Sequence, residues 1–353
     1  MKRLLAGASI GLVVLLAVLL SWPGPIDPVA WEPEPDRGLV GGFAEPLEME
    51  QARRIELGQA PEDVALGPDG ALYTGLLDGR IIRFNPVSGQ QTLFADTGGR
   101  PLGMQFDAGG RLIVADAARG LLAVSTEGSI AVLVDSHNGQ RLGLIDDLDI
   151  ADDGTIWFSS ATQRFPLGNY LLDFLEGRAT GLLLAHDPAT GQTRVALDGL
   201  RFANGVALGP EDAYVLVTET PAARITRLWI EGPRAGERDT FITGLPGLPD
   251  NLSFDGRDRF WVALPATRVA AIDRLAPYPL LRKLLAMVPK GWLSLAPPPL
   301  AWVAAIDLEG RVVASYRDAS GRFSTVTSAN DHGGTLYLGS IGEAAVLALP
   351  LRP

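Results

Sequence analysis

The chain has 353 residues and a formal net charge of −11, with 47% hydrophobic and 20% charged residues. This length and hydrophobic content allow a large folded core, and the negative charge argues against nucleic acid as a partner. The absence of cysteine excludes disulfide bonds, thiolate metal sites and a cysteine nucleophile, and the spacing of the three histidines fits no zinc motif.

Residues 1–21 are expected to form a membrane anchor or a signal peptide. The basic Met1–Arg3 precedes Leu4–Leu20, an unbroken apolar run near the lower length limit for a membrane-spanning helix. Ser21–Pro25 is a poor signal-peptidase site, which favours an uncleaved transmembrane helix over a cleaved signal. We therefore expect a single-pass inner-membrane protein with its folded part outside the cytoplasm, and a secreted or periplasmic form is the alternative. The proline-rich residues 22–49 predict an extended linker.

A repeated plan, a turn with Gly or Asp followed by a short β-rich strand, fills the rest of the chain. Six copies align on the first residue of that strand, at Leu72, Leu112, Ile156, Tyr214, Phe260 and Leu336. Their spacing is close to that of four-stranded propeller blades. Residues 50–353 are therefore predicted to form an all-β, six-bladed β-propeller, in which Arg53–Leu57 supplies the strand that the last blade lacks.

Two longer intervals between copies contain predicted helices. The first is Asn169–Gly177, and the second lies within Ala276–Leu300, where leucines recur at helical spacing between basic residues. The second segment either packs on the blades, or covers the propeller mouth or touches a membrane surface.

In four of the six copies, the residue ten positions before the aligned strand residue carries a carboxylate or amide group. We call these positions slots; they hold Glu62, Leu102, Asp146, Asn204, Asp250 and Val326. The next position in each copy holds Asp63, Gly103, Asp147, Gly205, Asn251 and Thr327. We take the aligned strand as the innermost strand of each blade, which places both sets beside the central channel. Carboxylates that converge on one axis repel each other unless a cation lies among them, and all-oxygen ligands favour Ca²⁺ over Mg²⁺. The pattern predicts a divalent cation in the channel, with Ca²⁺ as the first choice.

A family resemblance is carried by IDDLDIADDGTIWFSSAT (Ile145–Thr162), LRFANGVAL (Leu200–Leu208) and LPGLPDNLSF (Leu245–Phe254). These segments resemble strictosidine-synthase-like proteins of the adipocyte plasma membrane-associated type and, more distantly, the gluconolactonase/regucalcin and paraoxonase families of calcium propellers.

The resemblance implies metal ligands at Glu62, Asn204 and Asp250, with Asn251 as an additional amide ligand. It implies an oxygen ligand at Asp146 too, where the hydrolases often have asparagine. Leu102 falls near the position of the paraoxonase catalytic histidine, so a hydrolase of this sequence needs a different base.

The first functional hypothesis is a Ca²⁺-dependent hydrolase of lactones or aryl esters. Asp250 is the first candidate for activating water and Asp147 the second, while the metal polarises the carbonyl group. The residues expected to contact the small-molecule substrate are His137, Leu102 and Ser328. Two alternatives remain open: a non-catalytic binding propeller stabilised by Ca²⁺, and an amine–aldehyde condensing enzyme of the strictosidine-synthase type.

Overall fold

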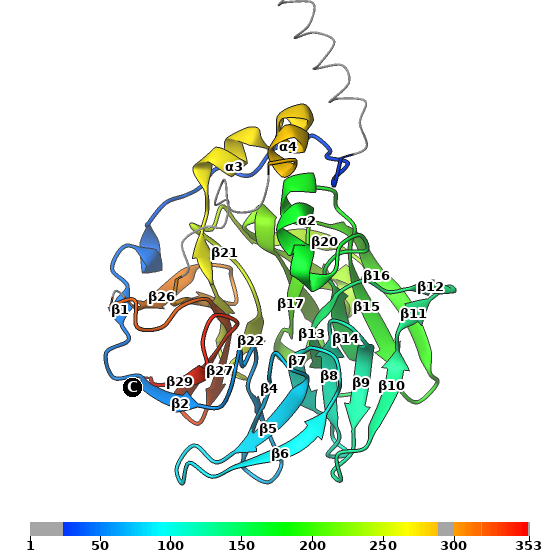
Figure 1. Cartoon of the computed structure of the whole chain (residues 1–353), viewed down its shortest axis with the longest axis vertical. Coiled ribbons are helices and arrows are strands. Elements are labelled where there is room, and N and C mark those ends of the chain that lie inside the picture. The colour runs from blue at the N-terminus through cyan, green and yellow to red at the C-terminus, as the bar shows by residue number, and fades with distance from the viewer. Residues whose placement is uncertain (1–23, 289–299, 319, 352–353) are drawn as a thin grey trace, which may run out of the picture.

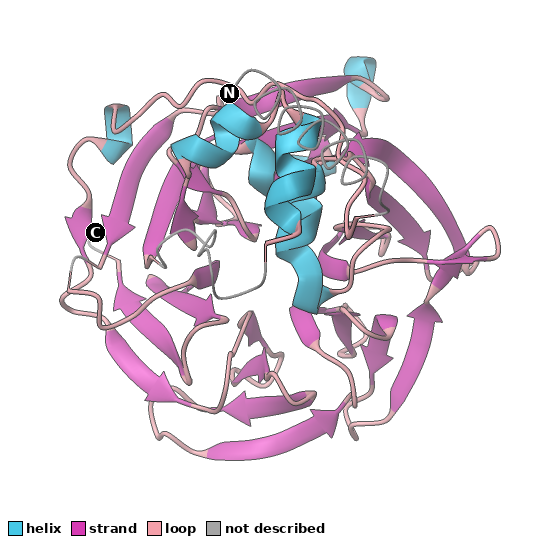
Figure 2. Cartoon of the chain, turned by 45° about the horizontal axis from the view of Figure 1, so that its top comes forward, coloured by secondary structure: helices cyan, strands magenta, loops and turns pink. Residues whose placement is uncertain are grey.

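Six β-sheets are arranged as blades around a central axis (Figures 1 and 2). The computed structural model describes residues 24–288, 300–318 and 320–351. The predicted all-β, six-bladed propeller is confirmed. Residues 1–21, for which a transmembrane helix is predicted, lie outside the described residues. Within the described ranges, no helix is both long enough and apolar enough to cross a membrane.

Each blade has four antiparallel strands, which follow one another from the channel outward. The first three blades contain β3 (Ala65–Leu66), β4 (Leu72–Gly75), β5 (Arg80–Phe84) and β6 (Gln91–Asp96); β7 (Pro101–Phe106), β8 (Leu112–Asp116), β9 (Gly120–Val124) and β10 (Ile130–Val134); and β13 (Ile145–Ile150), β14 (Ile156–Ser160), β15 (Gly181–Asp187) and β16 (Gln192–Leu200). The last three contain β17 (Ala203–Leu208), β18 (Tyr214–Glu219), β19 (Arg224–Trp229) and β20 (Arg238–Thr243); β22 (Leu252–Phe254), β23 (Arg259–Ala263), β25 (Trp302–Asp307) and β26 (Val312–Arg317); and β27 (Val326–His332), β28 (Thr335–Ser340), β29 (Ala345–Pro350) and β2 (Arg53–Glu56).

The sixth blade is completed by a strand from the beginning of the propeller. Strand β2 pairs antiparallel with β29, with Arg53 opposite Ala348 and Glu56 opposite Ala345. The predicted closure of the ring by Arg53–Leu57 is thereby confirmed. A further short strand, β1 (Leu47–Glu48), adds to the outer edge of the fifth blade parallel to β26.

The strand taken as innermost in the sequence is the second strand of each blade. Strands β4, β8, β14, β18, β23 and β28 contain the aligned residues, and each pairs with a preceding strand that lies nearer to the axis. That innermost strand is short in two blades, with two residues in β3 and three in β22, and has six or seven residues in the other four. The polar slots precede or begin these inner strands, so they still lie beside the channel although the strand assignment was wrong.

A separate hydrophobic cluster fills each of the six interfaces between neighbouring blades. Between blades two and three, for example, Ile113 and Leu121 pack against Phe158 and Leu184, and all four are fully buried. Burying one such side chain contributes about 1.5–3 kcal/mol, so the ring is held by packing between blades as well as within each sheet.

Helices cover one end of the propeller, at the top of Figure 1. They are α2 (Tyr170–Glu176), α3 (Ala270–Leu275) and α4 (Pro279–Ala286). The helices predicted in Asn169–Gly177 and within Ala276–Leu300 are present as α2 and α4, and α3 lies wholly before the predicted segment. The remaining short elements are η1 (Gly41–Phe43), η2 (Leu167–Asn169), η3 (Pro210–Asp212), η4 (Thr220–Ala222), η5 (Gly232–Arg234) and the paired strands β11 (Ser136–His137) with β12 (Gln140–Arg141) and β21 (Gly247–Leu248) with β24 (Ala266–Thr267).

The described part of the linker packs along this helical cap. The backbone N–H of Val29 donates to the carbonyl of Glu176 at the end of α2, and that of Trp31 donates to the carbonyl of Ala276 after α3. Residues 24–40 contain no helix or strand, whereas the end of the predicted linker forms η1 and β1 against the fifth blade.

Candidate metal centre

The five predicted metal ligands gather at the helix-covered end of the channel. Asp146 and Asn204 lie near the beginning of β13 and β17, and Glu62, Asp250 and Asn251 precede β3 and β22. All five are buried, with exposed fractions between 2% and 9%. The sequence register therefore brings together oxygen-bearing side chains from four blades.

Hydrogen bonds between these side chains leave three buried oxygens without a partner. The Asn251 side-chain amide donates to Glu62 Oε1 at 3.0 Å, and the side chain of Asn204 is hydrogen-bonded to the Asp250 carboxyl group. Glu62 Oε2, Asn204 Oδ1 and Asn251 Oδ1 have no hydrogen-bond partner. Because a buried oxygen without a partner costs about 1–3 kcal/mol, three such atoms in one group fit an electropositive ligand.

Burial and mutual repulsion disfavour the charged form of the carboxyl groups in this cluster. Burial and the nearby charges of Asp63, Asp250 and Asp146 raise the pKa of Glu62 well above its usual value. Burial and the charge of Asp250 do the same to the pKa of Asp146. Burial also raises the pKa of Asp250 to about 7, against the hydrogen bond from Asn204. A cation among these groups would restore their charged forms.

The donor set fits a hard cation. It consists of carboxylate and amide oxygens, which Ca²⁺ accepts in flexible coordination. Among the described residues, no three His, Asp or Glu side chains are close enough to bind a metal by themselves. The two asparagine oxygens are therefore needed to complete any site.

Arg100 is a part of this cluster that the sequence analysis missed. It is 7% exposed, and its charge interacts with those of Glu62 and Asp146. Three carboxylates and one guanidinium leave a formal charge of −2, which one divalent cation would cancel. Arg100 lies two positions before its blade's slot, so the repeat alignment gave no signal for it.

Glycines let neighbouring blades approach each other at this level of the channel. A Cβ on Gly103 would lie 2.1 Å from Asp147 Oδ1, and one on Gly205 would lie 2.6 Å from the carbonyl oxygen of Asp250. Neither position has room for a side chain. The glycines therefore determine how closely blades two and four approach the polar residues of the next blade.

Asp147, the second candidate base, links two blades. Its Oδ2 accepts a hydrogen bond from the backbone N–H of Val206 at 2.8 Å, as Asp63 Oδ2 does from Met104 at 3.0 Å. Asn330 donates to Asp63 Oδ1 at 2.7 Å. These bonds join innermost strands of successive blades, which gives Asp147 and Asp63 a structural role in closing the ring.

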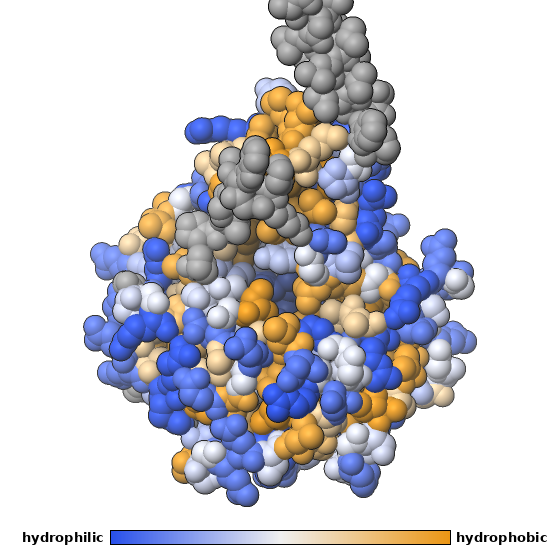
Figure 3. Space-filling view, viewed as in Figure 1, coloured by the Kyte–Doolittle hydropathy of each residue, from blue (hydrophilic) through white to orange (hydrophobic). Residues whose placement is uncertain are grey.

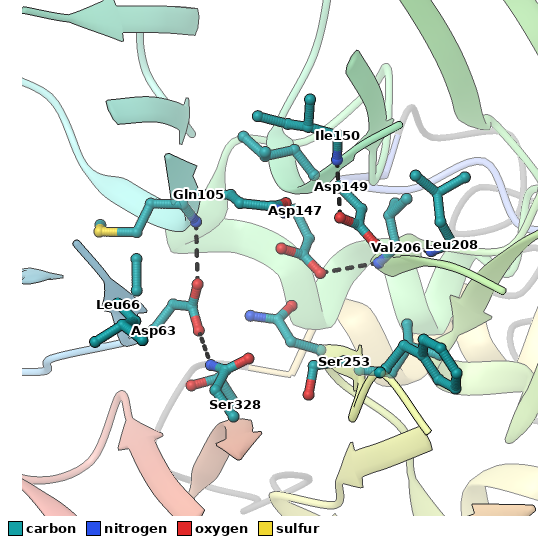
Figure 4. A pocket seen from close by; sticks show the side chains of 18 of the residues that line it. Asp63, Leu66, Gln105, Asp147, Asp149, Ile150, Val206, Leu208, Ser253 and Ser328 are labelled. Atoms are coloured by element: carbon teal, nitrogen blue, oxygen red, sulfur yellow. Dashed lines mark hydrogen bonds between the residues drawn. The ribbon is translucent and has the colours of Figure 1, made fainter. Parts of the chain in front are cut away.

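A cavity of about 520 Å³ opens at the other end of the channel (Figure 4). Its wall includes Asp147, Asn251 and Ser328, and also Asp63 and Asp149. Glu62, Asp146, Asn204 and Asp250 are not in its wall, so Asn251 is the predicted ligand that connects the cluster with the cavity. Ser328, predicted to contact substrate, is therefore on the cavity side.

The helix-covered side of the cluster is apolar. Leu102 packs with Leu144 and Phe202 beneath Tyr170 and Phe174 of α2. Burial and the charge of Asp250 raise the pKa of Tyr170, so this ring lies within electrostatic range of the cluster. Leu102 is thus part of a hydrophobic cover over the polar residues.

The structure places His137 outside the site. It belongs to the β11–β12 hairpin, which projects at the periphery of the molecule in Figure 1, and its ring contacts the side chain of the adjacent Asn138 at 3.1 Å. The hairpin follows the outermost strand of the second blade, and this position keeps His137 away from the channel.

Two family models match this chain. A strictosidine synthase model matches residues 146–233, and a strictosidine synthase-like N-terminal model matches residues 41–84. The first match contains Asp146 and Asn204, and the second contains Glu62.

Similar sequences cover most of the chain. Strictosidine synthase-like protein 6 of Arabidopsis thaliana is 37% identical over 84% of this chain and 80% of its own length. The adipocyte plasma membrane-associated protein of Danio rerio is 33% identical over 96% of this chain and 88% of its own length.

Solved propellers have the same fold at much lower identity. A gluconolactonase from Xanthomonas campestris matches with a TM-score of 0.63 at 19% identity, covering 94% of this chain and 99% of that protein. A calcium-binding regucalcin from Agrobacterium tumefaciens matches with a TM-score of 0.59 at 14% identity, covering 87% and 96%. At these identities the likeness shows the fold alone.

Proposed function

The chain belongs to the strictosidine synthase-like family, and on that basis we propose that it is a Ca²⁺-dependent hydrolase of lactones or aryl esters. The fold-level neighbours include one protein described as a gluconolactonase and one described as calcium-binding. Fold alone does not determine a reaction, so the proposal depends on the residues of the channel.

One observation carries the proposal. Glu62 Oε2, Asn204 Oδ1 and Asn251 Oδ1 come from three blades, are buried, and have no hydrogen-bond partner. Glu62, Asn204 and Asn251 would hold the ion together with Asp250, and Asp146 lies close enough to add charge. When bound, the cation would supply Lewis-acid polarisation of the substrate carbonyl group.

Side chains around the ion would supply the general base, orient it and exclude bulk water. Asp250 would take the proton of the attacking water as general base, because a bound cation would keep its carboxyl group in the charged form and would acidify water beside it. Asn204 would help to orient that carboxyl group, because its side chain lies close enough to lower the pKa of Asp250. Leu102, Phe202 and Tyr170 would exclude bulk water from the same side.

A second function, a non-catalytic propeller stabilised by Ca²⁺, has its own observation. Asp63 and Asp147 use their carboxylates to bind backbone N–H groups of the next blade. The polar channel can therefore serve ring closure without any turnover.

The test is a panel of lactones and aryl esters with the purified full-length protein in detergent, with Ca²⁺ and with a chelator. The proposal predicts activity that is lost in chelator and falls by about 10²–10⁴-fold in Asp250→Asn, the usual contribution of a general base. Asp198→Asn is the matched control, because Asp198 is exposed on the outer strand β16.

The other outcomes either contradict the proposed mechanism or support a different function. Activity that survives chelation or Asp250→Asn would contradict the proposed mechanism. A Ca²⁺-dependent rise in melting temperature without turnover would support the binding propeller. Condensation of an amine with an aldehyde, without ester hydrolysis, would support the strictosidine-synthase type of reaction.

A further inference from the structure

Helix α4 has an unusual distribution of side chains: its arginine is buried and its first two leucines are exposed. Arg282 is 1% exposed, whereas Leu280 and Leu281 are 54% and 48% exposed. Tyr278 just before the helix and Val288 just after it are also exposed. On an ordinary surface helix the leucines face the core and the charged residue faces water. The exposed apolar surface of α4 therefore calls for a partner other than water.

The buried arginine fixes the orientation of the helix. Arg282 Nη1 donates to the carbonyls of Leu175 at 2.8 Å and Glu176 at 3.1 Å. Its Nη2 donates to the carbonyl of Ala276 at 2.8 Å and also to that of Val29 in the linker. Because α2, the end of α3 and the linker share one guanidinium, α4 cannot rotate Leu280 and Leu281 inward without losing these bonds.

The exposed apolar residues form a contiguous patch instead of being scattered. Figure 3 shows hydrophobic surface gathered over α4 at the top of the molecule. The patch consists of Tyr278, Leu280, Leu281 and Val288. Single exposed apolar residues are normal on a soluble protein, but a group at one extremity indicates an interaction surface.

The chain itself indicates what covers the patch. The apolar run Leu4–Leu20 ends four residues before Gly24, and Gly24 lies against α4, since a Cβ on it would be 3.2 Å from Lys283 Cε. Four residues of extended chain span at most about 14 Å. A bilayer that receives Leu4–Leu20 must therefore lie within about this distance of α4.

The charge of the patch surroundings suits a membrane surface. The protein has a net charge of −11, yet Lys283 on α4 and the exposed Arg274 on α3 are basic. Basic residues beside exposed leucines are typical of helices that lie in the headgroup region, with the apolar face immersed by about 5–10 Å.

We propose that α4 lies in the interface of a lipid bilayer, with the patch of Tyr278, Leu280, Leu281 and Val288 immersed among the lipids. The helical cap then rests on the membrane, and the opposite end of the channel, with its 520 Å³ cavity, faces away from it. This placement does not depend on whether the channel hydrolyses esters.

Site-specific spin labels on the full-length protein test the placement. The chain has no cysteine, so Leu281→Cys and, as a control, Val87→Cys each provide one labelling site; Val87 is 94% exposed in the turn between β5 and β6. In nanodiscs of phosphatidylcholine and phosphatidylglycerol, the label at 281 is expected to collide with oxygen more often and with a water-soluble nickel chelate less often than the label at 87.

A second variant separates immersion from misfolding. Leu280→Glu combined with Leu281→Glu alters only exposed side chains, so its melting temperature should match the wild type, while a label at Tyr278→Cys loses its protection from nickel. Equal nickel accessibility at 281 and 87 in nanodiscs would overturn the proposal. So would dipolar broadening between labels at 281 with no change in oxygen collisions, which would indicate pairing of two copies through α4.

Discussion

Replacing Asn204 with leucine tests the metal centre by removing one oxygen at nearly constant volume. Asn204 Oδ1 is one of the three buried oxygens without a partner. A ligand that binds only the folded protein stabilises it by about 2.7 kcal/mol when the free ligand concentration is 100 times the Kd. For a propeller of this size each kcal/mol shifts the melting temperature by about 2–4 °C, so Ca²⁺ should raise the melting temperature of the wild type by roughly 5–10 °C.

The variant should lose most of this shift. Even the loss of an indirect partner of a metal ligand typically weakens binding 10–100-fold. At the same Ca²⁺ concentration the remaining stabilisation would be about 0.4–1.4 kcal/mol. The assay is thermal unfolding followed by circular dichroism, in a chelator and across a Ca²⁺ titration.

A matched variant shows whether the effect belongs to the metal centre. Asn330→Leu removes the hydrogen bond to Asp63 but leaves the three unpartnered oxygens in place. It should lower stability in the chelator and keep the Ca²⁺-dependent shift. An equal Ca²⁺ shift in wild type and Asn204→Leu would refute the assignment of Asn204, and no shift in the wild type would refute the site.

Three further predictions follow from single contacts. Burial raises the pKa of Asp173 to about 7, so the folded state binds the proton of this carboxyl group more tightly than the unfolded state does. Its stabilising contribution is present below about pH 4 and is lost as the pH rises towards 7. Asp173→Asn, which still accepts the hydrogen bond from Thr162, should raise the urea midpoint at pH 8 and leave it nearly unchanged at pH 3.5. An equal change at both pH values would contradict this. Gly205→Ala places a Cβ 2.6 Å from the Asp250 carbonyl oxygen and should destabilise the protein by about 1–3 kcal/mol in urea unfolding; an unchanged midpoint would show that the blades can separate. Arg282→Met leaves carbonyl groups of the cap without a donor, so hydrogen exchange should accelerate in α2 and α4 but not in the blades, and uniform acceleration would argue against a local role.

The repeated turn-and-strand plan was sufficient to predict the number of blades and the closing strand, but not the innermost strands. The second strand of each blade has an apolar pattern, whereas the inner strands contain polar residues and glycine, such as Asn204 and Gly205 in β17. Hydrophobic periodicity cannot mark a strand whose side chains face a polar channel. The choice between first and second strand therefore required the pairing itself.

The positions of the candidate ligands along the channel could be predicted from the sequence, but the hydrogen bonds and charges around them could not. Identical spacing placed Glu62, Asn204 and Asp250 at one level of the channel. The hydrogen bond from Asn251 to Glu62 joins residues 189 positions apart, and no local pattern indicates which oxygens stay without a partner. Arg100 was missed for a similar reason, because its charge matters only after blades one, two and three have met.

The pairing of β2 with β29 affects how the protein is made. Strand β2 ends at Glu56 and its partner begins at Ala345, so nearly the whole propeller is synthesised before the last blade can be completed. During that time β2 has no sheet to join and the edge of β28 is open, which are features that favour aggregation or pairing with another chain. A chain that stops before Ala345 would keep its five complete blades and its cap, but its ring would remain open.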